Sequence, residues 1–150
     1  VDDDAVAVAI EAPADADDEF ITAVALVQQS KWDEAGALLQ KYLRKNRDSE
    51  HYLEAQFLVG QCLFELQRFK NAITEFQKVI EAEDKVVRKG ATALWAPRAM
   101  FMQGRAFEEL GTKQDLEAAA LFFDELVRLY PAAADAERAR RRLEVLDANR

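Results

Sequence analysis

A pattern of small and bulky residues occurs three times in this sequence of 150 residues and limits the folds open to the chain. In each copy a small residue is followed by an alanine 12 or 15 positions later, and a bulky apolar residue comes four positions after that alanine. The three sets are Ala23, Ala35 and Leu39; Gly60, Ala72 and Phe76; and Gly104, Ala119 and Phe123. A unit this short cannot bury its own apolar face, so the three units are expected to stack into one continuous core.

The spacing within each copy is typical of two packed α-helices. Residues four positions apart lie on one face of a helix, and β-branched residues are scattered along the chain rather than alternating as in strands. Glycine inside a helix costs up to about 1 kcal/mol relative to alanine. Gly60 and Gly104 are therefore expected where the second helix of a pair comes close, and the fold is predicted to be all-α.

The repeats also predict the domain boundaries. Residues 18–147 form the repeat domain, with helix pairs at about 18–46, 49–83 and 97–131 and a capping helix at 132–147. The third copy has three extra residues between its two small positions, and these predict a longer turn at 111–114. Pro97 suits the first turn of a helix, and Tyr130 with Pro131 is expected to end the sixth helix.

The acidic charge belongs to one end of the chain. The net charge is −8, and residues 1–20 hold eight acidic residues and no basic one: Asp2, Asp3, Asp4, Glu11, Asp15, Asp17, Asp18 and Glu19. The remaining acidic and basic residues balance. We therefore predict that residues 1–17 are an acidic, disordered linker, because this composition buries too little apolar surface to offset its ordering entropy.

Several functional classes are not expected from the residue types present. Nucleic-acid binding needs clustered Lys and Arg on a basic domain, and no apolar run is long enough to cross a membrane. Cys62 and His51 are each the only residue of their type, which argues against a disulfide and a multi-histidine metal site. No glycine-rich phosphate loop or facing carboxylate pair is found. We expect no cofactor, no metal and no enzymatic activity.

The recurring positions resemble the tetratricopeptide repeat (TPR). A small residue, an aromatic or leucine (Trp32, Phe69, Leu116), an alanine, a bulky residue and a closing proline follow in the TPR order, although Ser30 stands where the turn glycine is usual. Tyr130-Pro131 followed by Ala136 and Ala139 is similar to repeats of bacterial envelope proteins, above all the Tol–Pal coordinator family and the outer-membrane assembly lipoproteins. The resemblance implies a right-handed solenoid of three helix pairs with a C-terminal capping helix, in the bacterial periplasm or cell envelope.

The resemblance implies a concave groove lined by the first helix of each pair, where a partner peptide would bind. Some of its aromatic residues are expected to lie partly in the core and partly in the groove. The predicted groove residues are Phe20, Val24, Phe57, Gln61, Phe64, Glu65, Arg98, Phe101, Arg105 and Glu108, with Asp17, Val27, Gln28, Glu54 and Glu109 beside them. The carboxylate clamp of co-chaperone members is absent, since its positions hold Phe20, Val24, Leu58, Arg98 and Met102.

Other residues have two interpretations each. Trp95, in the connector before the fifth helix, either packs over a helix end or is a contact anchor. The arginines Arg138, Arg140, Arg141 and Arg142 either form a solvated face or dock an acidic segment. His51 is expected at the surface or near a helix cap, with Ser49 as that cap, and Cys62 is expected to be buried.

The sequence therefore predicts a protein–protein interaction adaptor that holds a partner segment in its groove. The alternative is a structural element that self-assembles by head-to-tail stacking into a homo-oligomer. Partner identity, organism, oligomeric state and any upstream signal peptide, lipid anchor or coiled coil do not follow from these residues.

Overall fold

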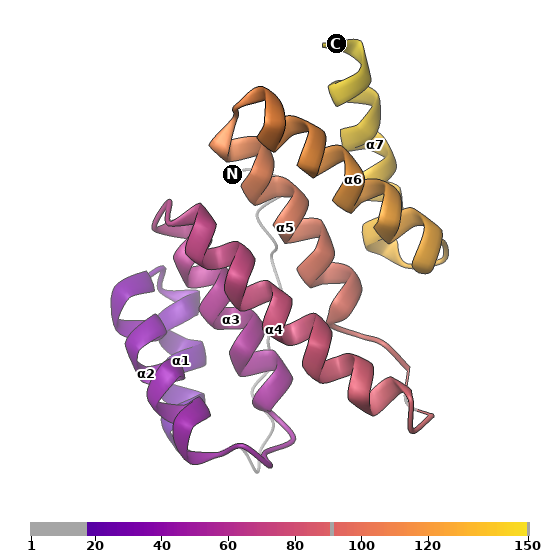
Figure 1. The fold of residues 1–150 in the computed structure, drawn as a ribbon. Coiled ribbons are helices and arrows are strands. Elements are labelled where there is room, and N and C mark those ends of the chain that lie inside the picture. Colours follow the sequence, from indigo (N-terminus) through magenta and orange to yellow (C-terminus); the bar gives the residue numbers. More distant parts are fainter. Residues whose placement is uncertain (1–17, 91, 150) are drawn as a thin grey trace.

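The computed structural model describes residues 18–90 and 92–149, and throughout this part of the chain the secondary structure is helical. The predicted linker, residues 1–17, lies outside the described residues. The helices are α1 (Asp18–Gln28), α2 (Trp32–Lys45), α3 (Tyr52–Glu65), α4 (Phe69–Val87), α5 (Ala96–Leu110), α6 (Lys113–Leu129) and α7 (Ala134–Ala148). Three helical hairpins followed by one closing helix confirm the predicted all-α repeat solenoid (Figure 1).

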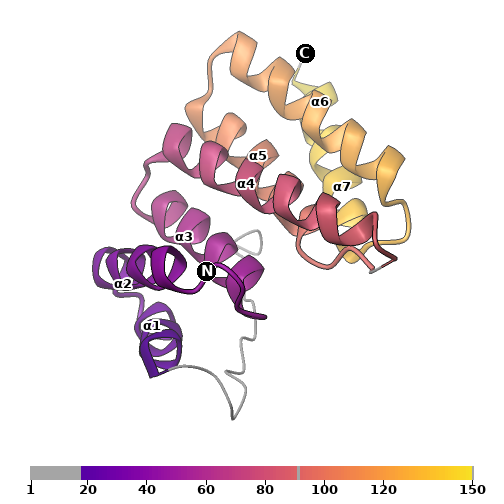
Figure 2. The same ribbon diagram turned by 60° about the horizontal axis from the view of Figure 1, so that its bottom comes forward.

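The helices form two layers. Each even-numbered helix packs against the odd-numbered helix before it and against the one after it. The odd-numbered helices also contact one another, α1 with α3 and α5 with α7, whereas α2, α4 and α6 have no comparable packing among themselves. The odd-numbered helices therefore form the inner layer of the stack and the even-numbered helices the outer layer (Figure 2).

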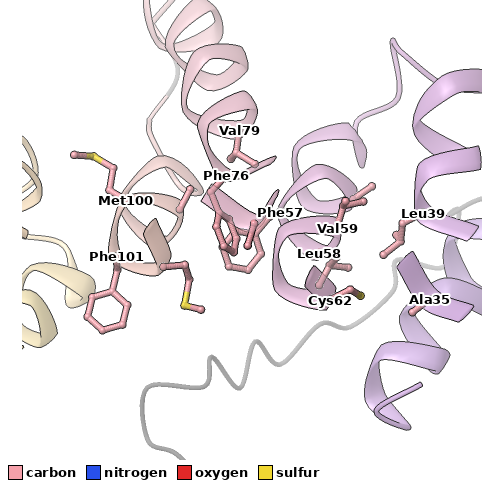
Figure 3. Packing of buried hydrophobic residues seen from close by; sticks show 14 of the residues in the cluster. Ala35, Leu39, Phe57, Leu58, Val59, Cys62, Phe76, Val79, Met100 and Phe101 are labelled. Atoms are coloured by element: carbon pink, nitrogen blue, oxygen red, sulfur yellow. The ribbon is translucent and has the colours of Figure 1, made fainter. Parts of the chain in front are cut away.

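The two helical glycines sit where the sequence predicts close packing. A Cβ atom built on Gly60 would lie 2.5 Å from the ring of Phe76, and one on Gly104 would lie 2.4 Å from the ring of Phe123. Both rings are fully buried. Figure 3 shows Phe76 of α4 beside Phe57 of α3, and on the other side of α3 it shows Leu39 of α2 facing Val59. Packing of each outer helix onto an inner helix thus extends one core along the stack.

The prediction of a longer turn in the third repeat is wrong. Only Gly111 and Thr112 separate α5 from α6, whereas three residues separate the helices of the first two pairs. The three extra residues form an additional first turn of α6, because Thr112 and Asp115 make a capping box: the Thr112 hydroxyl accepts from the Asp115 N–H, and the Asp115 carboxylate accepts from the Thr112 N–H. Leu116 therefore lies within α6 instead of opening it.

The turns of the first two pairs use a left-handed residue that is not glycine. Ser30 has a φ of 59° and Gln67 a φ of 62°, while Gly111 fills the corresponding turn of the third pair with a φ of 77°. Glycine adopts this conformation without steric cost, and other residues do not. The turns are nevertheless closed by backbone hydrogen bonds, in which Lys31 N–H donates to Leu26 O and Arg68 N–H donates to Leu63 O.

The long connector between α4 and α5 is held by a buried carboxylate that the sequence did not reveal. Helix α4 continues to Val87, and the chain then turns at Gly90, whose φ is 99°. Glu83 is only 3% exposed. Its carboxylate accepts hydrogen bonds from the backbone N–H of Trp95, at 2.9 and 3.1 Å, and from that of Ala96, at 2.8 Å. Glu83 thus caps α5 from another helix.

Candidate functional site

The inner face carries a row of charged side chains contributed by three successive inner helices. Glu54 lies on α3, Arg98 on α5, and Asp135 and Arg138 on α7. The positive charge of Arg98 acts on both carboxyl groups, and Arg138 Nη1 lies 3.4 Å from Asp135 Oδ1. We call these four residues the charged row. It alternates in sign along the stack and joins the second repeat to the capping helix.

Burial and charge act in opposite directions on the two acids of the charged row. Burial raises the pKa of the Glu54 carboxyl, and the charges of His51 and Arg98 partly oppose that rise. Burial likewise raises the pKa of Asp135, against the effect of Arg138, Arg98 and the hydrogen bonds that Asp135 accepts. Glu54 is half-buried and Asp135 is buried, and nearby positive charges offset the effect of burial only in part, so an added cationic group would be favoured.

The two arginines of the charged row are held over aromatic rings. The Arg98 guanidinium lies 5.4 Å from the centre of the Trp95 ring, and the Arg138 guanidinium lies 4.1 Å from that of Phe101. Such stacking positions a guanidinium without neutralising its charge. Arg98 is half-buried and keeps part of its surface in solvent.

A second group of charges ties α5 to α7. Arg105 Nη1 lies 3.5 Å from Glu108 Oε1, and Arg105 Nη2 lies 3.2 Å from Glu109 Oε1. Arg142 of α7 donates to both oxygens of Glu108, from Nε at 3.0 Å and also from Nη2. The side chains of Arg105 and Glu108 are each only 7% exposed. These residues, predicted to contact a partner, are largely used inside the fold.

The predicted placement of Phe20 and Val24 in the groove is wrong, and Phe57 and Phe101, which were expected partly in the core and partly in the groove, lie in the core. Phe20, Phe57 and Phe101 are fully buried and Val24 is 3% exposed. Each ring packs on a ring of the adjacent outer helix, for example Phe101 on Phe123 with centroids 5.6 Å apart. The first-helix position that the sequence assigned to the groove faces the core, because the outer helix is close enough to cover it.

The remaining predicted groove residues on α1 and α3 differ in exposure. Gln61 is buried and donates to Glu65 Oε1 at 2.9 Å. Phe64 is half-buried, with its ring edge-on to Phe69 at 5.2 Å. Val27 is also half-buried and Gln28 is exposed, while Asp17 lies outside the described residues.

Trp95 packs on the core, the first of its two interpretations. Its ring lies 5.3 Å from that of Phe57, bridging the second and third repeats, whereas its neighbour Leu94 is 68% exposed. The arginines of α7 do not all form the solvated face that the sequence predicted. Arg138 and Arg142 fold onto α5, Arg140 Nη1 lies 3.2 Å from Glu137 Oε2, and Arg141 is exposed.

His51 and Cys62 have structural surroundings. His51 occupies the N-cap position of α3, the second of its two expected placements, and is not at the surface: it is 7% exposed and its ring stacks on that of Phe20 at 4.8 Å. Ser49 does not occupy the N-cap position of α3, but its hydroxyl accepts from the His51 N–H at 3.1 Å. Cys62 is buried as predicted, and burial raises the pKa of its thiol to about 12.

Two grooves on the outer face were missed by the sequence analysis. One, of about 970 Å³, lies between α2 and α4 over α3, and the other, of about 550 Å³, lies between α4 and α6 over α5. Neither α2 with α4 nor α4 with α6 packs together as closely as helices that are neighbours in the chain. The sequence signal for these grooves is an apolar residue of an outer helix that does not face the core. Leu121 is an example, and it is 69% exposed.

The described residues hold neither a cluster suited to a metal ion nor a helix suited to a membrane span. Within residues 18–90 and 92–149, no cluster of histidine, cysteine, aspartate or glutamate side chains could hold a metal ion. None of the helices that the structure describes is both long and apolar enough to span a membrane.

Comparison with known families agrees with the architecture. Two family models, each described as tetratricopeptide repeat, match residues 22–86 and residues 98–133. Together they cover more than half of the chain and include most of all three hairpins. The chain belongs to the tetratricopeptide-repeat family. No curated protein is similar enough to count as a relative.

TPR membership gives the hairpins a general role. TPR repeats mediate protein–protein interactions, and the family is typically non-catalytic. In this TPR chain the inner face offers the charged row, and the outer face offers two grooves. Both surfaces therefore have to be considered as sites for a protein partner.

Proposed function

We propose that this TPR chain is an adaptor that holds a segment of a partner protein on its inner face, across the charged row. The observation that carries the proposal is that three inner helices present charges of both signs: Arg138 lies 3.4 Å from Asp135 and over the Phe101 ring, and Arg98 lies over the Trp95 ring. The charge of Arg98 lowers the pKa of Glu54 on α3 and of Asp135 on α7, against the effect of burial. A segment lying across α3, α5 and α7 would meet charges of both signs. Such complementarity sets orientation and specificity more than raw affinity.

The partner segment would carry both a basic and an acidic side chain. Its cationic group would be placed beside Glu54 or Asp135, whose carboxyl groups are partly desolvated. Its anionic group would be placed at Arg98, which the Trp95 ring orients. The buried phenylalanines are not contacts in this proposal. They fix the helices that present the charges.

The proposal is tested by photo-crosslinking in the native host. A photoreactive amino acid at position 98 or 54 is expected to capture one partner protein, and the same residue at position 117, which is exposed on α6, is expected not to. Arg98→Glu should abolish capture from position 54 while leaving the circular dichroism spectrum helical. Equal capture from all three positions would contradict the proposal.

We further propose that the partner belongs to a bacterial cell-envelope assembly. This rests on the resemblance of the Tyr130-Pro131 closing turn, with Ala136 and Ala139 after it, to the Tol–Pal coordinator type. Fractionation of the host cell checks it: the chain is expected with periplasmic or membrane-associated proteins. Recovery only with cytoplasmic markers would overturn this part and leave the adaptor proposal standing.

A second candidate function is self-assembly, which one feature of the outer face favours. Leu121 and Leu129 of α6 are 69% and 47% exposed and line the groove between α4 and α6, a surface that a second copy could cover. Light scattering over a wide concentration range is expected to show association that Leu121→Ser weakens. A strict monomer at all concentrations would eliminate this candidate.

A further inference from the structure

The groove between α2 and α4 is a second candidate surface, and none of the four residues of the charged row lines it. Its volume of about 970 Å³ is within the range of small peptide and ligand sites. Its lining residues come from the C-terminal half of α2, from the α2–α3 connector, from α3 and from α4. The lining residues extend in the sequence from Gln40 on α2 to Val86 on α4.

The charges lining this groove leave an excess of unengaged cations. Arg44, Arg47 and Lys85 line it, and none of them forms an ion pair within the described part of the chain. All three are exposed. An anionic group entering the groove would therefore meet three cations without first having to break an existing pair.

The groove also contains acids and a fourth cation, but most of these already have partners. Glu75 receives hydrogen bonds from Lys78 at 3.0 Å and from Gln56 at 2.6 Å. Glu50 Oε1 lies 3.5 Å from His51 Nε2. Asp48 is thus the only lining carboxylate for which the described residues provide no engaged partner. The groove favours anions over cations.

Apolar side chains fill the space between these cations. The lining includes Leu43, Tyr52, Leu53, Val59, Ala82 and Val86. Val86 is 45% exposed at the rim, and Tyr52 and Leu53 are half-buried. A segment that bound here would bury apolar side chains on the floor while its acidic side chains reached the rim, the arrangement of an apolar centre and a polar edge found in protein interfaces.

The neighbouring groove has the opposite character. Glu81, Asp84 and Glu125 line the space between α4 and α6, and Leu121 and Leu129 stand at its edge. Asp84 pairs with Arg88 and Glu125 with Arg128, but no basic residue of the described chain lines this groove, so an acidic segment would meet no cation of the lining there. The preference for acids is therefore local to the α2–α4 groove and does not follow from the overall charge of the protein, which is −8.

We propose that the α2–α4 groove binds an acidic segment of a partner protein that also carries apolar side chains. This site is separate from the charged row on the inner face. The adaptor could then hold two segments at once, one on each layer of the solenoid. Linking two weak contacts in this way raises the overall affinity without new contacts at either site.

The test uses the full chain and a short fluorescein-labelled peptide in which aspartate and leucine alternate. Binding is followed by fluorescence anisotropy at low ionic strength, with a peptide carrying lysine in place of aspartate for comparison. The aspartate peptide is expected to bind, and the lysine peptide to bind at least about tenfold more weakly. Raising the salt concentration should weaken binding, because exposed ion pairs are screened.

Two sets of variants locate the site. Arg44→Glu, Arg47→Glu and Lys85→Glu together should weaken binding by about tenfold or more, because each attraction becomes a repulsion. The matched control is Lys31→Glu, Lys70→Glu and Lys113→Glu, which changes the net charge equally at exposed positions outside the groove. It should alter the affinity by less than about twofold. Val86→Ser should cause a smaller loss than the charge reversals.

Three results would overturn the proposal. They are the absence of binding by the unmodified chain, equal binding of the two peptides, and equal losses in the two triple variants. Arg98→Glu on the inner face separates this proposal from the adaptor function, because it should leave the aspartate peptide bound as before. If Arg98→Glu removed binding and the groove variants did not, the acidic segment would belong to the inner face.

Discussion

Two glycines set how closely the helices of the second and third pairs approach each other. Any side chain at Gly60 or Gly104 would enter space that the rings of Phe76 and Phe123 already fill. Both rings are held by other core residues and have no exposed surface into which to move. The small-residue position of the repeat is therefore a steric requirement of the fold.

We predict that Gly60→Ala and Gly104→Ala each lower the free energy of unfolding by about 1–3 kcal/mol, because overpacking a dense core costs this much. Urea denaturation followed by circular dichroism measures the effect. Gly36→Ala is the matched control, since its added Cβ would lie 3.6 Å from the nearest atom, an ordinary contact. That variant should be as stable as the unmodified chain or more stable. Combining Gly104→Ala with Phe123→Leu should recover part of the loss.

Two turn residues carry a conformational cost that glycine would remove. Ser30 and Gln67 have positive φ angles, and the left-handed region costs a residue with a Cβ about 1–2 kcal/mol. Glycine loses more entropy on folding, which offsets part of this gain. Ser30→Gly and Gln67→Gly are each expected to raise the free energy of unfolding by about 0.5–1 kcal/mol in urea melts. The converse change, Gly111→Ala, should be destabilising, and a destabilised Gln67→Gly would refute the argument.

At the scale of the helix, the start of α5 depends on a residue of α4. Trp95 at the N-cap position has no side chain able to accept a hydrogen bond, so the first N–H groups of α5 need an acceptor from elsewhere. The Glu83 carboxylate supplies it and also fixes the connector against α4. Trp95 is in turn placed on Phe57 and beneath Arg98. Glu83 thereby fixes the position of Trp95, over whose ring Arg98 of the charged row lies.

We predict that Glu83→Ala lowers the free energy of unfolding by about 2–3 kcal/mol, because it removes charge-assisted hydrogen bonds to two backbone N–H groups. Glu83→Gln keeps one oxygen acceptor and should lose less. Hydrogen exchange of the Trp95 and Ala96 amides should become faster in both variants. Glu81→Ala, on the exposed side of the same helix, should stay within about 0.5 kcal/mol of the unmodified chain.

The helices were predictable from the sequence in most respects, but the start of α6 and the cap of α5 were not predicted. The three hairpins, the small positions and the capping helix were predictable because spacing along a helix fixes which residues share a face. The extra turn of α6 was mistaken for a loop because the Thr112–Asp115 capping box, although visible in the sequence, was not recognised. The Glu83 cap could not have been predicted, since its acceptor and donors lie 12 and 13 residues apart on different elements.

At the scale of the whole molecule, the candidate site was the least predictable part. The sequence predicted that Phe57 and Phe101 lie partly in the groove and partly in the core. Both are fully buried, because the outer helices pack over them. Arg98 lies on α5, and the acidic residues whose pKa it lowers belong to α3 and α7, which come together only through the stacking of the repeats. The outer grooves depend on the spread of α2, α4 and α6, which no single repeat encodes.

The charged row makes a prediction about the stability of the whole solenoid as pH changes. The pKa values of Glu54 and Asp135 in the folded chain are raised above their usual values of 4.5 and 3.8. The folded state therefore binds more protons than the unfolded state between those values and the raised ones. In that window the slope of stability against pH from these groups is negative. Their contribution is most favourable below the usual values and is lost as pH rises through the raised ones.

The double variant Glu54→Gln and Asp135→Asn removes both titrating groups and tests this sign. We expect its free energy of unfolding, relative to that of the unmodified chain, to increase as pH rises from about 4 toward neutrality, and then to level off. Urea denaturation at a series of pH values provides the comparison. A difference that stays constant with pH, or one that decreases, would contradict the raised pKa values. A constant difference combined with lost partner capture would assign the charged row to recognition alone, with no coupling to folding.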